Sequence, residues 1–173
     1  MAKKVGSIFL VCCATLLNAC NPVVQENHEV TNPNIRVFFT PSTECERNIV
    51  QEIEKAHKIR VAVYSITNQS IYNALVKAHN RGVDIKIVTD RTQAKGKGSL
   101  VGNLKKAGIP VLTNHKHKIE HNKFAVFDDS MVVTGSYNWT TNASKYNSEN
   151  CVFFDQMADK YSNRFEYLWN MYQ

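Results

Sequence analysis

The sequence lacks the features that define several specialised classes of protein. It contains no C-x2-C pair with metal-ligand spacing and no internal repeat, and its main apolar run, residues 8–17, is too short to span a bilayer as a permanent helix. The composition, 43% hydrophobic and 21% charged, is that of an ordinary globular protein. Collagen-like, coiled-coil and disordered architectures are therefore excluded, and a length of 173 residues indicates one domain.

Acidic residues are also in short supply. The 21 Lys and Arg residues outnumber the 15 Asp and Glu residues, which gives a formal net charge of +6. A positive balance favours polyanionic partners such as nucleic acid or an anionic lipid surface, but it does not choose between them.

The N-terminal segment has the pattern of an export signal. Two lysines, Lys3 and Lys4, precede the apolar run at residues 8–17, so we expect residues 1–20 to be a secretory signal peptide. The sequence that ends this segment, Leu17-Asn18-Ala19-Cys20, resembles a bacterial lipobox. Two outcomes stay open: a lipoprotein anchored to a membrane through Cys20, or plain cleavage into the periplasm. Residues 21–34 are polar and are expected to form a tether to a catalytic domain at 35–173.

Only two of the five cysteines, Cys45 and Cys151, lie outside the segment expected to be removed or lipidated. In an oxidising compartment they could form one disulfide, although they belong to separate expected elements. Free cysteine is among the most buried residue types, so two small buried thiols are the favoured interpretation.

Strand and helix patterns alternate through the first half of the expected domain. Strands are predicted at 35–39, 60–64, 83–88 and 109–112, with helices between them on the apolar faces of 49–56, 71–78 and 99–106. Thr43 and Glu46 have the spacing of a capping box at the start of the first helix. This βαβαβαβ order predicts parallel strands covered by helices.

The second half of the domain has a different pattern. A hairpin is expected from the strands 124–127 and 131–134, followed by a strand at 151–154. A C-terminal helix at 157–172 carries an aromatic stripe that we assign to core packing. The loop 91–98 is interpreted as a solvated connector. Together these elements predict an α/β fold, a mixed central β-sheet flanked by helices in an α/β/α sandwich.

A group of polar residues lies where these expected strands begin or end. His121 and Lys123 precede an apolar strand, and alternation along a strand would direct both side chains to one face. Ser136 and Asn138 follow the next strand, and Glu149 precedes the last one. A nucleophile, a cation, two neutral donors and a carboxylate at neighbouring strand ends are the groups that phosphoryl chemistry requires.

The same residues resemble the HKD signature of the phospholipase D superfamily: His121-x-Lys123-x4-Asp128, then Gly135-Ser136-Tyr137-Asn138 and Glu149. The single motif and the short chain are most similar to the small bacterial Nuc-like endonuclease branch. The resemblance implies a phospholipase D-like fold and catalysis without metal or cofactor. It implies further roles, which are listed here: His121 as the phosphorus nucleophile, Lys123 and Asn138 holding phosphate oxygens, Ser136 as a supporting hydroxyl, Glu149 fixing the tautomer of His121, and Asp128 tying the strand end.

The sequence offers no second H-x-K, whereas displacement at phosphorus by a neutral histidine also needs an acid for the leaving oxygen. We therefore expect two chains to share one site in a homodimer, as the resemblance also implies. The leading function is a metal-independent phosphodiesterase, an endonuclease that hydrolyses DNA, with RNA as a second substrate. The alternatives are a phospholipid-hydrolysing phospholipase D and a non-catalytic, nucleic-acid-binding lipoprotein.

Two further groups have more than one interpretation. The segment 115–118, His-Lys-His-Lys, could be a metal tract, a solvated loop or a basic approach to a polyanion, and its place before the motif favours the last. Tyr137 and Trp139 could stack on a base or pack in the core, and packing is at least equally supported.

Overall fold

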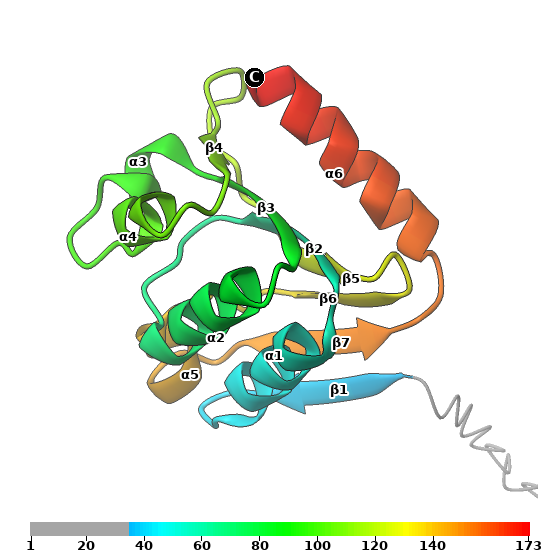
Figure 1. Ribbon diagram of the computed structural model, residues 1–173. Helices are drawn as coiled ribbons and strands as arrows, with labels where there is room; N and C mark the ends of the chain where they lie inside the picture. Colours follow the sequence, from blue (N-terminus) through cyan, green and yellow to red (C-terminus); the bar gives the residue numbers. More distant parts are fainter. Residues whose placement is uncertain (1–34) are drawn as a thin grey trace, which may run out of the picture. The chain divides into compact units, whose positions relative to one another are not determined.

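The computed structural model describes residues 35–173 (Figure 1). The predicted signal peptide at 1–20, the lipobox at Cys20 and the tether at 21–34 lie outside the described residues. Within 35–173, no helix combines the length and the hydrophobicity that crossing a membrane requires.

A single seven-stranded sheet forms the centre of this domain. Its strands lie in the spatial order β1-β7-β6-β5-β2-β3-β4. The pairs β2–β3 and β3–β4 are parallel, and the other neighbouring pairs are antiparallel. The mixed α/β architecture predicted from the sequence is confirmed. The strands are β1 (Arg36–Phe39), β2 (Lys58–Val63), β3 (Asp84–Thr89), β4 (Val111–Thr113), β5 (Lys123–Phe127), β6 (Met131–Gly135) and β7 (Asn150–Phe154).

The prediction of one parallel unit from the first four strands was wrong for β1. This strand lies at the far edge of the sheet and pairs antiparallel with β7, with Phe38 opposite Cys151. The hairpin β5–β6 and strand β7 separate it from β2. Apolar periodicity marks a segment as a strand but does not specify its neighbour, because backbone hydrogen bonds are the same for every sequence.

Helices cover both faces of the sheet (Figure 1). Residues of α1, α2, α4 and α5 pack with one face in the larger hydrophobic cluster. Helix α6 packs on the other face, against β5 and β6 residues such as Phe124, Val126 and Val132. The helices are α1 (Glu44–Lys55), α2 (Gln69–Asn80), α3 (Arg91–Ala94), α4 (Val101–Lys106), α5 (Thr141–Lys145) and α6 (Ala158–Tyr172). The loop expected at 91–98 therefore begins with the short helix α3.

The aromatic stripe of α6 serves core packing, as predicted. Phe165, Leu168, Trp169 and Tyr172 are buried, and the half-buried Tyr161 packs edge-on against Phe124 with 5.2 Å between ring centroids. This stripe holds α6 on the sheet.

The predicted capping box of α1 does not form. Thr43 is the N-cap residue but its side chain makes no capping hydrogen bond. Glu46 Oε2 instead accepts hydrogen bonds from Asn68 Nδ2 at 2.7 Å and Ser144 Oγ at 3.0 Å. Burial opposes ionisation of Glu46, but these hydrogen bonds outweigh it and hold the pKa of the carboxyl below its usual value. Glu46 therefore joins α1, α2 and α5, a tertiary role that local spacing does not reveal.

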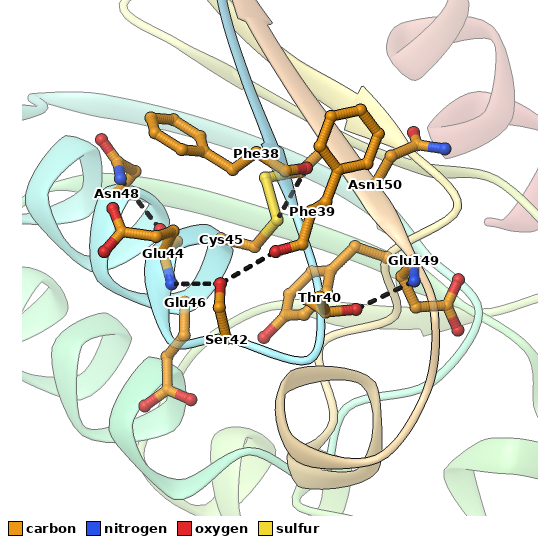
Figure 2. Close-up of a disulfide and its surroundings, with 12 residues drawn as sticks. Phe38, Phe39, Thr40, Ser42, Glu44, Cys45, Glu46, Asn48, Glu149 and Asn150 are labelled. Atoms are coloured by element: carbon orange, nitrogen blue, oxygen red, sulfur yellow. Dashed lines mark hydrogen bonds between the residues drawn. A yellow bond between two sulfur atoms is a disulfide. The ribbon is translucent and has the colours of Figure 1, made fainter.

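Cys45 and Cys151 form a disulfide that joins α1 to β7, so the favoured interpretation of two free thiols was wrong (Figure 2). Both residues are buried, as expected, and their Cα atoms are 5.9 Å apart. The pairing of β1 with β7 explains this proximity, because α1 begins shortly after β1 and Cys45 Sγ lies 3.7 Å from the carbonyl oxygen of Phe38, the residue opposite Cys151.

Candidate active site

The order of the strands collects the predicted site residues at one edge of the sheet. Strands β2 and β6 end at this edge, and their antiparallel neighbours β5 and β7 begin there. Lys123, the first residue of β5, lies opposite Val63, the last residue of β2. Ser136 and Asn138 follow β6, and Glu149 immediately precedes β7. The tertiary structure thus gathers residues spread over a long stretch of sequence.

His121 and Lys123 meet on the ring of Tyr64. The centroids of the His121 and Tyr64 rings are 4.8 Å apart in an edge-on arrangement, and Lys123 Nζ lies 5.2 Å from the Tyr64 ring centroid. His121 lies just outside β5, so the predicted alternation along a strand does not describe it. Lys123 Nζ donates a hydrogen bond of 2.8 Å to the carbonyl oxygen of His121. The imidazole and the ammonium group are therefore neighbours for a different reason than the one predicted.

Tyr64 is a site residue that the sequence analysis missed. It directly follows β2, and its hydroxyl accepts a hydrogen bond of 3.0 Å from Gln93 Nε2. A cation over an aromatic face gains electrostatic attraction from the ring. The pairing of β2 with β5 was the signal that would have revealed it, and no local pattern contains that pairing.

The environment of Lys123 prepares it to hold an anion. Partial burial lowers the pKa of its ammonium group, while the charges of Glu149 and Glu120 act in the opposite direction. Within residues 35–173 no carboxylate lies within salt-bridge distance of Lys123 Nζ. A partly desolvated cation without a fixed counterion interacts more strongly with a bound phosphate than a solvated one does.

Asn138 carries an unsatisfied polar atom. Among the described residues, its Oδ1 is the single buried side-chain oxygen or nitrogen without a hydrogen-bond partner. Leaving such a group unpaired costs about 1–3 kcal/mol. Unsatisfied groups of this kind occur at functional sites, so the amide of Asn138 is available to a ligand.

The tight contact between β6 and β7 positions Ser136. The exposed Ser136 Oγ accepts a hydrogen bond of 3.1 Å from the amide of Asn150. Gly135 has φ +148°, and a Cβ at this position would lie 2.3 Å from the carbonyl oxygen of Asn150. Only glycine allows the two strands to approach this closely.

Glu149 is held in place mainly through its backbone. The Thr40 amide donates to its carbonyl oxygen at 3.0 Å, and the Glu149 amide donates to Thr40 Oγ1 at 2.9 Å, as Figure 2 shows. Its side chain accepts a hydrogen bond from Asn147 Nδ2 at 3.0 Å. Within residues 35–173 no hydrogen bond joins Glu149 to His121, so the predicted control of the His121 tautomer stays a prediction.

Asp128 is far from the other site residues. It follows the opposite end of β5, about 17 Å along the strand from Lys123 at the usual rise per residue. Its Oδ1 accepts hydrogen bonds from the amides of His57 at 2.8 Å and Lys58 at 2.7 Å. Asp128 therefore ties the start of β2 to the end of β5 and does not reach the site.

Two buried carboxylates, also missed by the sequence analysis, anchor the loop that carries His121. Asp90 follows β3, and its Oδ2 accepts the amide of Glu120 at 3.1 Å. Glu120 Oε1 accepts the amide and the side-chain Nδ2 of Asn122 at 3.1 and 2.6 Å. Glu120 Oε2 accepts the Tyr172 hydroxyl at 2.7 Å, and that hydroxyl also lies 2.8 Å from His117 Nδ1. An acidic residue beside the motif was visible in the sequence, but its partners were not.

The remaining candidates have clear positions. Residues 115–118 are exposed and follow β4, which keeps a basic approach to the site open. Tyr137 and Trp139 are buried, so both pack in the core and do not stack on a base. Burial raises the pKa of Tyr137 to about 12. Over the described residues, no three His, Cys, Asp or Glu side chains are arranged to hold a metal ion.

Comparison with known proteins identifies the family. The model described as "Cardiolipin synthase, PLD-like domain" matches residues 49–169. A phospholipase D of Rickettsia typhi is 38% identical over 136 residues, which cover 77% of this chain and 67% of that protein. The chain belongs to the phospholipase D superfamily. It is a hydrolase that acts on phosphodiester bonds.

Other relatives of this phospholipase D-like chain carry different names. A mitochondrial cardiolipin hydrolase of Xenopus laevis is 34% identical, over 73% of this chain and 61% of its own length. The structure of Nuc from Salmonella typhimurium, a phospholipase D family member, matches with a TM-score of 0.74 and 33% identity over 79% of this chain and 93% of Nuc. NucT from Helicobacter pylori matches with a TM-score of 0.73 and 25% identity over 79% and 95% of the two chains. These matches confirm the predicted superfamily and its α/β fold.

Proposed function

We propose that this phosphodiesterase is a metal-independent endonuclease that hydrolyses DNA, with RNA as a second substrate, at a site shared by two chains. The observation that carries the proposal is the meeting of His121 and Lys123 on Tyr64, at the edge where Ser136, Asn138 and Glu149 also lie. A nucleophile and a cation without a fixed counterion at one place are what displacement at a phosphodiester requires.

In the proposed first step a ring nitrogen of His121 attacks phosphorus. The new N–P bond forms as the bond from phosphorus to the leaving oxygen breaks, and the leaving oxygen takes a proton from His121 of the partner subunit. Lys123 and Asn138 hold the non-bridging oxygens, and Ser136 supports them. Glu149 accepts the other ring proton of His121 and so fixes its tautomer.

In the second step water hydrolyses the phosphohistidine. The partner's His121, now neutral, accepts a proton from the water as its oxygen bonds to phosphorus and the N–P bond breaks. Both histidines return to their starting protonation, so the cycle balances. One chain supplies only one H-x-K, which is why the proposal requires the homodimer.

The choice of nucleic acid as substrate is supported by charge. The chain carries a formal +6, and exposed basic residues at 115–118 precede the motif. Its strongest structural matches bear the names Nuc and NucT. The second candidate is phospholipid hydrolysis, which the names phospholipase D and mitochondrial cardiolipin hydrolase of its relatives favour. A non-catalytic nucleic-acid-binding lipoprotein is less favoured, because every residue of the motif is present.

One assay tests the substrate. The purified protein without residues 1–20 is incubated with plasmid DNA, RNA and cardiolipin vesicles, each with excess chelator and with His121→Asn as the control. We expect cleavage of DNA by the wild-type protein alone. Cleavage confined to the vesicles would replace the endonuclease by a phospholipase, and activity that requires a divalent ion would refute the metal-independent mechanism.

The proposed location is outside the cytoplasm. We infer from residues 1–20 that the protein is exported, either to the periplasm or to a membrane through a lipidated Cys20. Globomycin, which blocks lipoprotein signal peptidase, should cause the precursor to accumulate in the lipoprotein case alone. A full-length protein retained in the cytoplasm would contradict both forms.

A further inference from the structure

A basic pocket lies between α6 and the sheet, beside the catalytic motif. This α6 pocket has a volume of about 260 Å³ and is lined by Asn122, Phe124, Thr134, Lys160, Tyr161 and Arg164. None of these residues has a role in the mechanism proposed above.

The pocket is adjacent to the catalytic residues but lies on the other side of β5. Asn122 is the chain neighbour of both His121 and Lys123, at the usual Cα spacing of about 3.8 Å. Side chains alternate along a strand, and Phe124 packs in the α6 cluster whereas Ala125 packs in the opposite one. Lys123 has the parity of Ala125, so it leaves the sheet edge on the face opposite the pocket.

The charge of the pocket comes from two residues of α6. Lys160 and Arg164 are four positions apart, one helical turn, and both are exposed. Within residues 35–173 neither lies within salt-bridge distance of a carboxylate. Arg164 is placed over the ring of Tyr167 at 5.2 Å. The two cations are therefore free to bind an anion.

The rest of the lining suits a phosphate better than an acyl chain. Thr134 and Asn122 contribute polar groups. The apolar members are already packed, since Tyr161 meets Phe124 and Phe154 edge-on at 5.2 and 5.8 Å. The nearby Glu120 has both carboxylate oxygens occupied by hydrogen bonds from Asn122 and Tyr172.

We propose that the α6 pocket binds a phosphate group of the nucleic-acid strand that flanks the scissile phosphate, held by Lys160 and Arg164. This inference rests on the proposed endonuclease function and adds to it a second point of attachment. A strand that crosses the sheet edge would place one phosphate at His121 and Lys123 and a neighbouring one in the pocket. A diester with a single phosphate could use the first position alone.

The experiment compares the variant Lys160→Ala/Arg164→Ala with a matched control, Lys105→Ala/Lys106→Ala, which removes two exposed cations from the last turn of α4. Cleavage is measured on a single-stranded hexanucleotide and on bis(4-nitrophenyl) phosphate, which has one phosphate. Binding of the labelled hexanucleotide is measured by fluorescence anisotropy in a His121→Asn background. Cardiolipin vesicles form a separate arm.

We expect the α6 variant to raise KM and Kd for the hexanucleotide roughly tenfold. The slope of log K against log salt should fall by about 1.4, the value for two lost contacts to a single strand. Activity on bis(4-nitrophenyl) phosphate and the control variant should stay at wild-type values.

Several results would overturn the inference: equal hexanucleotide binding by the α6 and control variants, an equal loss on both substrates, or dependence on the pocket for cardiolipin alone. A wild-type protein that hydrolyses the nitrophenyl ester but not DNA would refute the endonuclease proposal separately. In that case the anisotropy measurement still decides whether the pocket binds a nucleic-acid phosphate.

Discussion

The Tyr172 hydroxyl, at the C-terminal end of α6, donates a hydrogen bond of 2.7 Å to Oε2 of Glu120, the residue before His121. Both side chains are buried, and burial is the main reason that the pKa of Tyr172 is raised well above its usual value. The last helix of the chain is thus bonded directly to the loop that carries the proposed nucleophile. This contact positions His121 from the opposite end of the domain sequence.

Tyr172→Phe should reduce kcat about tenfold and leave KM nearly unchanged, because one oxygen of Glu120 loses its partner and the His121 loop loosens. An unsatisfied buried acceptor also costs about 1–3 kcal/mol of stability. Kinetics on bis(4-nitrophenyl) phosphate and thermal unfolding measure the two effects. Tyr167→Phe, on the exposed side of the same helix, is the control. A fall in Tm with wild-type kcat would show that Tyr172 is structural only.

Lys123→Ala should lower turnover at least ~100-fold without unfolding the protein, because it removes the charge that holds the phosphate. Lys55→Ala, an exposed lysine at the end of α1, provides the control. Circular dichroism would verify the fold. Wild-type turnover in a folded Lys123→Ala protein would refute the proposed role.

The pH profile should show the same lysine. Burial lowers the pKa of Lys123, so its charge is present at neutral pH and is lost as the pH rises through a value below that of an ordinary lysine. The rate should therefore fall on the alkaline side, and Lys123→Arg should remove this fall because arginine stays charged there. An unchanged alkaline limb in the arginine variant would assign it to another group.

Reduction of the Cys45–Cys151 disulfide should destabilise the domain substantially. The bond joins residues 106 positions apart, and loop-closure entropy assigns about 4.7 kcal/mol to a loop of this size. We expect Tm to fall by more than about 10 °C in reductant. The double variant Cys45→Ala/Cys151→Ala should be insensitive to reductant. Equal Tm values for the oxidised and reduced wild-type protein would contradict the contribution of the bond.

Mixed dimers test the shared site. If each site needs His121 from both chains, random reassociation of equal amounts of wild type and His121→Ala leaves about one quarter of the dimers active. Activity on DNA should then follow the square of the wild-type fraction after the chains have been unfolded, mixed and refolded. A linear dependence, with exchange verified, would show that one chain carries a complete site.

The sequence by itself determined the local elements and the chemistry of the site. Alternating apolar residues identified strands such as β2 and β5, because alternation along a strand depends only on which face is buried. The aromatic stripe of α6 was correctly assigned to the core for the same reason. The residue types of His121, Lys123, Asn138 and Glu149 pointed to phosphoryl chemistry before any contact was known.

Only the tertiary structure decided which distant segments meet. The place of β1 beside β7, and with it the Cys45–Cys151 bond, followed from strand pairing that no local pattern encodes. The same holds for Tyr64 beneath His121 and for the bond between Glu120 and Tyr172. Backbone pairing is nearly independent of side-chain identity, so such contacts are selected by the packing of the whole core and not by neighbours in the chain.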